Sequence, residues 1–424
     1  MKISKVKFDS LLFTVIVILN ISFLFAVSLD VIFPFSREEQ SIFLLFLNII
    51  YILSKSRSEF PRLSFNQSPF SWCIIFSFML LFVQLLCSFS VSDFNSFFLA
   101  VSLILLNISF LCIAGLEFKK KQKVSSITKP INYIAIYVIF VSIIVFCLLL
   151  LKILSIDKFA VDHTKYSLFE GNYNISQTEI FSPANMIFLL STDRGIPFFG
   201  QFGIFTGICH EPHLSTLLVT PSLFFLLSMQ KNKYFIIPFV FYSLLAASVT
   251  NLLLLPLCLC IYYIFFKLKS RVLYFKIFLV FFIVFIFYYF KNEIIQSLGL
   301  NLILLKTTSG NASFDTTTDI LSYMYNPSSI LGSGILIYSG NPKSTDIGAI
   351  NFILNILFQI SFIYGTIKMV LSKNNSIGVF SVGLIYFFLH SLKIGQMVYQ
   401  FPFLIYILYL GHLTWLKNIK NENI

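Results

Sequence analysis

Charged side chains are scarce in this sequence. They make up 11% of its 424 residues, whereas soluble globular proteins carry about 25%. That shortage excludes an ordinary soluble domain. Hydrophobic residues make up 57% instead, and apolar runs recur from one end of the chain to the other. Runs of roughly 20 apolar residues have the length needed to cross the ~30 Å hydrocarbon core of a bilayer, so the composition predicts a polytopic membrane protein.

Other expected features of secreted or cofactor-bearing proteins are also missing. The first apolar run, residues 11–33, is long enough to span and lacks a small-residue cleavage motif, so we expect no cleavable signal peptide. Cys258 and Cys260 lie in an apolar run without another Cys or His nearby, which favours buried apolar side chains over a zinc site. Without an internal repeat, a low-complexity linker or a soluble domain, residues 1–424 are expected to form a single integral membrane domain, and nothing implies a cofactor.

The apolar runs predict an all-α fold with about twelve transmembrane helices, within a range of ten to thirteen. The expected spans are residues 11–33, 40–54, 72–90, 95–116, 132–153, 213–229, 234–249, 250–266, 272–290, 347–367, 375–391 and 398–416. Both termini are then expected to be cytoplasmic, because an even number of spans separates them.

The basic residues follow the positive-inside rule when the N-terminus is placed in the cytoplasm. In that topology 20 of the 30 Lys and Arg residues fall on the cytoplasmic side, together with only four acids: Asp9, Glu59, Glu117 and Glu422. The net charge of +12 is therefore explained by the excess of basic residues on the cytoplasmic side of the membrane, and we expect no nucleic-acid partner.

Two long polar connections, residues 154–212 and 291–346, fall on the outer face in this topology. Most other connections are short, so the outer side is expected to carry the function. The first contains a semi-apolar stretch, IFSPANMIFLL, which is too short to span and is expected to be re-entrant or to lie on the surface. The second contains ILGSGILIYSG, which lacks the G-K-[ST] ending of a phosphate loop.

Polar chemistry is densest in ICHEPHLST, residues 208–216. Pro212 suits the first turn of a helix, so Glu211 is expected at a helix N-terminus, where the dipole favours a carboxylate. Either a helix cap or a catalytic acid or base fits this position. Zinc is disfavoured because His210 and His213 are three residues apart with a proline between them, whereas H-E-x-x-H places two histidines on one helix face; we expect no metal.

The stretch FTGICHEPHLSTLLVTPSLFFLL resembles the Gly-x-x-x-Glu-Pro element of Wzy-type O-antigen and capsular polysaccharide polymerases, in the O-antigen ligase-like superfamily. LLAASVTNLLLLP is similar to the Ser/Thr-marked span that follows in that family, and SSILGSGILIYSGNPKSTDIGAINFILNILFQISFIYG to its closing G-x-G…D…N element. The overlap covers roughly residues 150–365 by motif and the whole chain by architecture. The family's arginine before the glycine is absent: Ile204 and Phe205 occupy that region, and Arg194 is the nearest arginine.

The resemblance implies a multi-pass glycosyltransferase of the bacterial cytoplasmic (inner) membrane. Such enzymes polymerise undecaprenyl-pyrophosphate-linked oligosaccharide repeat units on the outer leaflet, transferring the glycan from the lipid pyrophosphate to a sugar hydroxyl. The implied partners are this lipid-linked oligosaccharide, the lipid bilayer and a chain-length regulator protein. An O-antigen ligase, which uses another acceptor, is an open alternative. A polysaccharide flippase or transporter is an alternative from another class, and would predict charges deep in the spans and repeat symmetry.

The resemblance also implies the site residues. A base must take the proton of the acceptor hydroxyl, and Glu211 is expected in that role or as the organiser of His210 and His213. Cations must bind the pyrophosphate leaving group. By contrast, His390 and His412, inside spans, are expected to be packed histidines. The expected substrate-binding residues are Arg194, Lys306, Lys343, Asp346 and Gly207.

Overall fold

A computed structural model gives the fold of the chain, and most of the residues that it describes are helical. Helices cover at least part of every predicted span, so the positions of the helices agree with the apolar runs. The described residues are 5–25, 37–55, 68–88, 94–121, 124–154, 160–161, 180–181, 188–196, 199–209, 212–229, 233–268, 273–289, 352–372, 374–391 and 406–416.

The helices fall before and after a small sheet. Those before it are α1 (Lys5–Phe25), α2 (Arg37–Lys55), α3 (Ser71–Ser88), α4 (Phe94–Lys121) and α5 (Val124–Leu150). Those after it are α6 (Pro212–Val219), α7 (Pro221–Ser228), α8 (Ile236–Ala246), α9 (Val249–Tyr262), α10 (Leu273–Tyr289), α15 (Phe352–Val370) and α16 (Asn375–Ser391). A short 3-10 turn, η6 (Lys233–Phe235), precedes α8, a π-helical turn, η7 (Tyr263–Lys267), continues α9, and residues 406–416 are also helical.

Two helical stretches in the described part of the chain are long and apolar enough to cross a membrane. They are Ser125–Leu150, with 26 residues, and Thr250–Lys267, with 18 residues. Shorter apolar stretches include Pro212–Ser228 and Asn375–His390. Length and composition thus support membrane association, and both long stretches coincide with predicted spans.

A four-stranded antiparallel sheet in the first long loop departs from the all-α prediction. Its strands, β1 (Ala160–Val161), β2 (Ile180–Phe181), β3 (Leu189–Ile196) and β4 (Phe199–Gly207), are ordered β1-β2-β3-β4. The stretch expected to be re-entrant or surface-lying begins in β2 and ends in β3. Residues 203–209 are all buried, so both faces of the end of β4 are covered. A strand buried on both faces lacks the polar–apolar alternation by which strands are recognised in sequence.

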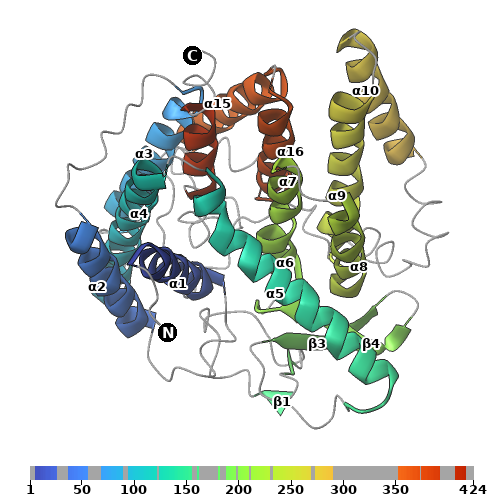
Figure 1. Ribbon diagram of the computed structural model, residues 1–424, viewed down its shortest axis with the longest axis horizontal. Coiled ribbons are helices and arrows are strands. Elements are labelled where there is room, and N and C mark those ends of the chain that lie inside the picture. The colour runs from blue at the N-terminus through green and yellow to red at the C-terminus, as the bar shows by residue number, and fades with distance from the viewer. Residues whose placement is uncertain are drawn as a thin grey trace.

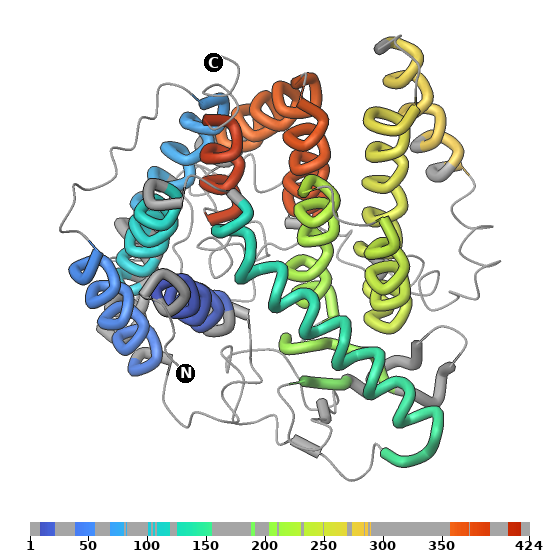
Figure 2. The backbone as a smooth tube through the Cα atoms, viewed as in Figure 1, coloured from blue at the N-terminus to red at the C-terminus, as the bar shows by residue number. Residues whose placement is uncertain are grey.

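Helix α5 is the centre of the arrangement. It contacts α1 and α4 on one side and α6, α7 and α8 on the other, and it crosses the middle of the molecule in Figures 1 and 2. Helix α16 packs against α7 and α9, and α15 packs against α3. The sheet lies near the C-terminal end of α5, where β4 contacts α5, α6 and α8 (Figure 1).

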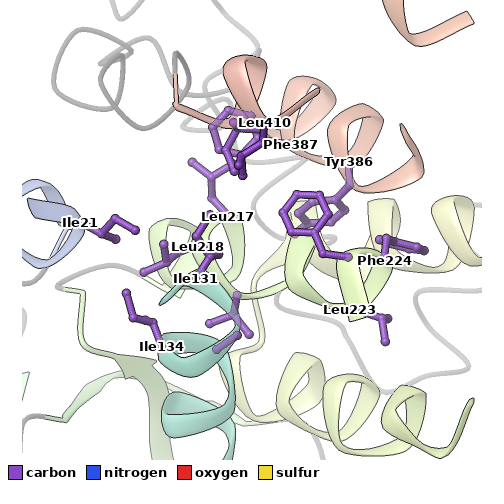
Figure 3. Close-up of a cluster of buried hydrophobic side chains, with 14 of the residues drawn as sticks. Ile21, Ile131, Ile134, Leu217, Leu218, Leu223, Phe224, Tyr386, Phe387 and Leu410 are labelled. Atoms are coloured by element: carbon purple, nitrogen blue, oxygen red, sulfur yellow. The ribbon is translucent and has the colours of Figure 1, made fainter. Parts of the chain in front are cut away.

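Buried apolar side chains from distant parts of the chain meet where α1, α5, α6, α7 and α16 converge (Figure 3). Lipid tails are as apolar as these side chains, so in a membrane such contacts stabilise the fold mainly through close packing. Close approach needs small residues: a β-carbon on Gly383 of α16 would lie 3.1 Å from the carbonyl oxygen of Pro221 and 2.8 Å from Cε1 of Phe225. The apolar side chains at this meeting point include Ile21, Ile131, Ile134, Leu217, Leu218, Leu223, Phe224, Phe387 and Leu410.

Candidate functional site

The candidate site is the junction at which strand β4 leads into helix α6. Gly207 ends β4 with a φ of +68°, a left-handed conformation that side chains other than glycine rarely adopt. A β-carbon at this position would lie 2.5 Å from Ser215 Oγ and 2.9 Å from Cγ1 of Val138. The junction therefore requires glycine both for its backbone angle and for the close packing of β4 against α5 and α6.

Hydrogen bonds fix the two sides of this junction. Ser215 Oγ and the Tyr242 hydroxyl share a buried hydrogen bond of 2.6 Å, which ties α6 to α8. On the strand side, Thr206 Oγ1 donates to the carbonyl oxygen of Leu189 at 3.0 Å, and the backbone N–H of Cys209 donates to the carbonyl oxygen of Thr206 at 3.3 Å. These bonds join α6 to α8 and the end of β4 to β3.

The structure describes three of the eight predicted site residues. Gly207 ends β4, and His213, the second residue of α6, is half-buried. Arg194 lies in β3. The remaining predicted site residues lie outside the described part of the chain: His210, Glu211, Lys306, Lys343 and Asp346. Glu211 nevertheless directly precedes Pro212, which begins α6, so the expected helix start is confirmed.

The pairing of β3 with β4 bears on the missing family arginine. Ser191 of β3 lies opposite Ile204 of β4, and Gly195 lies opposite Gly203, with an irregular register between these pairs. Arg194 falls within that irregular segment. The sheet thus brings the backbone of Arg194 beside the part of β4 where the resemblance leads one to expect an arginine.

A second set of polar residues, which the sequence reasoning missed, lies buried among the helices behind α6. It comprises Thr220, Ser243, Asn251, Tyr386 and His390, here named the Asn251 cluster, and all five are at most 3% exposed. Asn251 Oδ1 accepts hydrogen bonds from Tyr386, at 2.5 Å, and from Thr220, at 3.0 Å. Asn251 Nδ2 donates to Ser243 Oγ at 2.7 Å, and His390 Nδ1 lies 3.0 Å from the Tyr386 hydroxyl.

The Asn251 cluster reaches the candidate junction through α6. The Tyr386 hydroxyl lies 3.4 Å from the carbonyl oxygen of Thr216, and Thr216 Oγ1 donates to the carbonyl oxygen of His213 at 3.0 Å. His390 is buried, as expected for a packed histidine, but it is also part of a polar network. The signal that could have pointed to the cluster is the presence of Asn251, Thr220 and His390 inside apolar runs.

The junction offers the half-buried imidazole of His213 at the start of a helix, where the helix dipole favours an anion. These groups suit the binding of hydroxyl-rich or anionic molecules and the transfer of protons. Within the described ranges, no three His, Cys, Asp or Glu residues are grouped so that they could hold a metal ion. Comparisons of the chain with protein families, with curated proteins and with solved structures find no match.

Proposed function

We propose that the chain is a glycosyltransferase of the bacterial cytoplasmic membrane that polymerises undecaprenyl-pyrophosphate-linked oligosaccharide units on the outer leaflet. The observation that carries the proposal is the setting of the Gly-x-x-x-Glu-Pro element. Its glycine, Gly207, is held in a left-handed conformation at the end of a strand, and its proline, Pro212, begins a helix that is buried from Leu214 onward. Glu211 lies between these two residues in the sequence, directly before Pro212.

We further propose that all twelve predicted spans cross the membrane. Large apolar side chains face outward on helices of both halves of the chain, whereas polar residues such as Asn48 and Asn251 are fully buried. On α10, Phe278 is 63% exposed and Phe281 is 69% exposed, and on α2, Phe46 is 60% exposed. Soluble proteins rarely expose contiguous apolar surface on this scale, so lipid is the environment that suits these helices.

In the proposed reaction, a hydroxyl oxygen of the acceptor sugar attacks the anomeric carbon of the donor glycan. The bond from that carbon to the pyrophosphate oxygen breaks, and undecaprenyl pyrophosphate leaves with the bonding electrons. Glu211 takes the hydroxyl proton, directly or through His210 or His213. Arg194, with Lys306 and Lys343, stabilises the charge of the leaving pyrophosphate, and Asp346 contributes to substrate binding. The pairing of β3 with β4 supports a role for Arg194 near the junction.

Deletion of the gene in its native host tests this function against the alternatives. Loss of a polymerase leaves surface glycan that carries a single repeat unit. Loss of a ligase leaves full-length polymer on the lipid carrier without transfer to its final acceptor, and loss of a flippase removes glycan from the outer surface. Restoration of normal chain length by the intact gene on a plasmid completes the test, and either of the last two phenotypes would contradict the proposal.

A further inference from the structure

The Asn251 cluster is costly to maintain in an apolar bundle. A buried polar group without a hydrogen-bond partner is strongly destabilising, and ionisable side chains such as His390 are rare among apolar helices unless they serve a function. The cluster also joins helices far apart in sequence: Thr220 directly follows α6, whereas Asn251 belongs to α9 and His390 to α16. Such a network can fix the relative positions of the helices that it joins.

The donors and acceptors give this network a direction. Tyr386 has one hydroxyl proton, and the 2.5 Å hydrogen bond to Asn251 Oδ1 uses it. His390 Nδ1 must therefore carry the proton of the 3.0 Å bond to Tyr386, which fixes the histidine tautomer. The amide of Asn251 is oriented by Ser243, which accepts from its nitrogen. Each member thus depends on its neighbour, and removal of one hydroxyl disturbs the whole chain of bonds.

The cluster meets α6 at a break in the helix. Pro221 has no backbone N–H, so the helical hydrogen-bond ladder is interrupted where α6 gives way to α7. At the same level, the carbonyl oxygen of Thr216 accepts from the Thr220 N–H at 2.9 Å and lies 3.4 Å from the Tyr386 hydroxyl. Gly383, three residues before Tyr386 on α16, lets that helix pack directly against Pro221. Figure 3 shows Tyr386 extending from α16 toward α6 and α7.

We propose that the Asn251 cluster sets the orientation of α6, and through it the placement of His213 and of the helix start, Pro212, which Glu211 precedes in the sequence. Thr220, Asn251, Tyr386 and His390 are positioning residues in this proposal, because they act through α6 and are buried behind it. The proposal rests on the proposed function, since polymer length is its readout. Misplacement of a reacting group by about 1 Å is sufficient to reduce a rate by about a hundredfold, so a lost hydroxyl in this network has a large predicted effect.

The test compares two buried tyrosines, of which Tyr386 belongs to the Asn251 cluster and Tyr406 does not. Both are fully buried: the Tyr386 hydroxyl donates to Asn251 Oδ1, whereas the Tyr406 hydroxyl donates to the carbonyl oxygen of Ile127 of α5 at 2.9 Å. Tyr386→Phe and Tyr406→Phe therefore each remove one buried hydroxyl, inside the cluster and outside it. With equal amounts of protein in the membrane, we expect Tyr386→Phe to lower the ratio of polymer to single-repeat glycan about tenfold or more, and Tyr406→Phe to leave it within about twofold.

Two conservative pairs separate positioning from folding. Thr220→Ser keeps the hydroxyl that bonds Asn251 and is expected to retain normal polymer, whereas Thr220→Val keeps the shape, loses the bond and is expected to resemble Tyr386→Phe. His390→Asn keeps a donor near the position of Nδ1 and is expected to retain more polymer than His390→Leu.

Equal effects of Tyr386→Phe and Tyr406→Phe, or equal effects of Thr220→Ser and Thr220→Val, would overturn the positioning proposal. Normal polymer from Tyr386→Phe together with loss of polymer from Glu211→Gln would also overturn it, while leaving the proposed function in place. Normal polymer from Glu211→Gln and from the gene deletion would overturn the proposed function and the positioning proposal together.

Discussion

Ser215 Oγ occupies the space that a β-carbon on Gly207 would need, at a separation of 2.5 Å. Gly207→Ala forces the serine to move and also places an alanine at a φ of +68°, which costs roughly 1–2 kcal/mol for an L-residue. We therefore expect Gly207→Ala to lower the thermal unfolding midpoint of the protein purified in detergent and to reduce polymer formation.

Gly411→Ala is the matched control for this substitution. Gly411 lies in the helix formed by residues 406–416, and the atoms nearest to its β-carbon would be Cδ1 of Leu384, at 3.0 Å, and ring atoms of Phe70, at 3.5 and 3.6 Å. A helical Gly→Ala change favours the helix by roughly 0.5–1 kcal/mol, so Gly411→Ala is expected to be close to neutral or slightly stabilising. In a Ser215→Ala background, Gly207→Ala should lower the thermal unfolding midpoint by less than it does in the native background. Equal decreases in the presence and absence of Ser215 Oγ would contradict this view of the junction.

A second prediction concerns the buried pair of asparagines, Asn20 and Asn48, that joins α1 to α2. Asn20 and Asn48 exchange two buried hydrogen bonds, at 2.9 and 3.0 Å, and Asn48 Nδ2 also donates to Ser109 Oγ of α4 at 2.8 Å. Asn48→Leu leaves the Asn20 amide buried without that partner, at an expected cost of about 1–3 kcal/mol. Two apolar partners need no hydrogen bond. The double variant Asn20→Leu/Asn48→Leu should therefore lower the free energy of unfolding by less than the sum of the two single changes. Strict additivity in thermal unfolding would contradict this pairing.

The proposed orientation predicts opposite labelling of two lysine positions. Lys152 follows the long helix α5, Lys267 ends the π-helical turn after α9, and both side chains are exposed. In a variant without the seven native cysteines, Lys152→Cys is expected to react with a membrane-impermeant maleimide on intact cells. Lys267→Cys is expected to react only after the membrane is opened. Labelling of both cysteines from the same side would contradict the predicted topology.

The helix positions could be predicted from the sequence because long apolar runs depend only on local composition. The sheet could not be predicted in this way, since the end of β4 is buried on both faces and its glycine- and phenylalanine-rich sequence lacks alternation. The break between α6 and α7 at Pro221 could not be predicted either, because a proline in an apolar run does not always end a helix. Pro130 and Pro256, for example, lie within helices α5 and α9.

The candidate junction could be located in the sequence because its glycine, glutamate and proline lie within six consecutive residues. The Asn251 cluster could not be assembled from the sequence, because Thr220, Asn251 and Tyr386 are separated by many residues and only the packing of α16 against α7 and α9 brings them together. Polar residues in apolar runs show that a partner is needed, and the fold determines which partner it is.

The most direct measurement is the length of surface polysaccharide made by Glu211→Gln in the native host deleted for the gene. Glu179→Gln, which changes another acid of the same predicted outer loop, is the matched control. We expect the Glu211 variant, present in the membrane at normal levels, to yield single-repeat glycan on a gel, because glutamine cannot accept the hydroxyl proton. The Glu179 variant is expected to yield normal chains. Full-length, normally distributed chains from the Glu211 variant would contradict the assignment of this residue and of the junction as the site of glycosyl transfer.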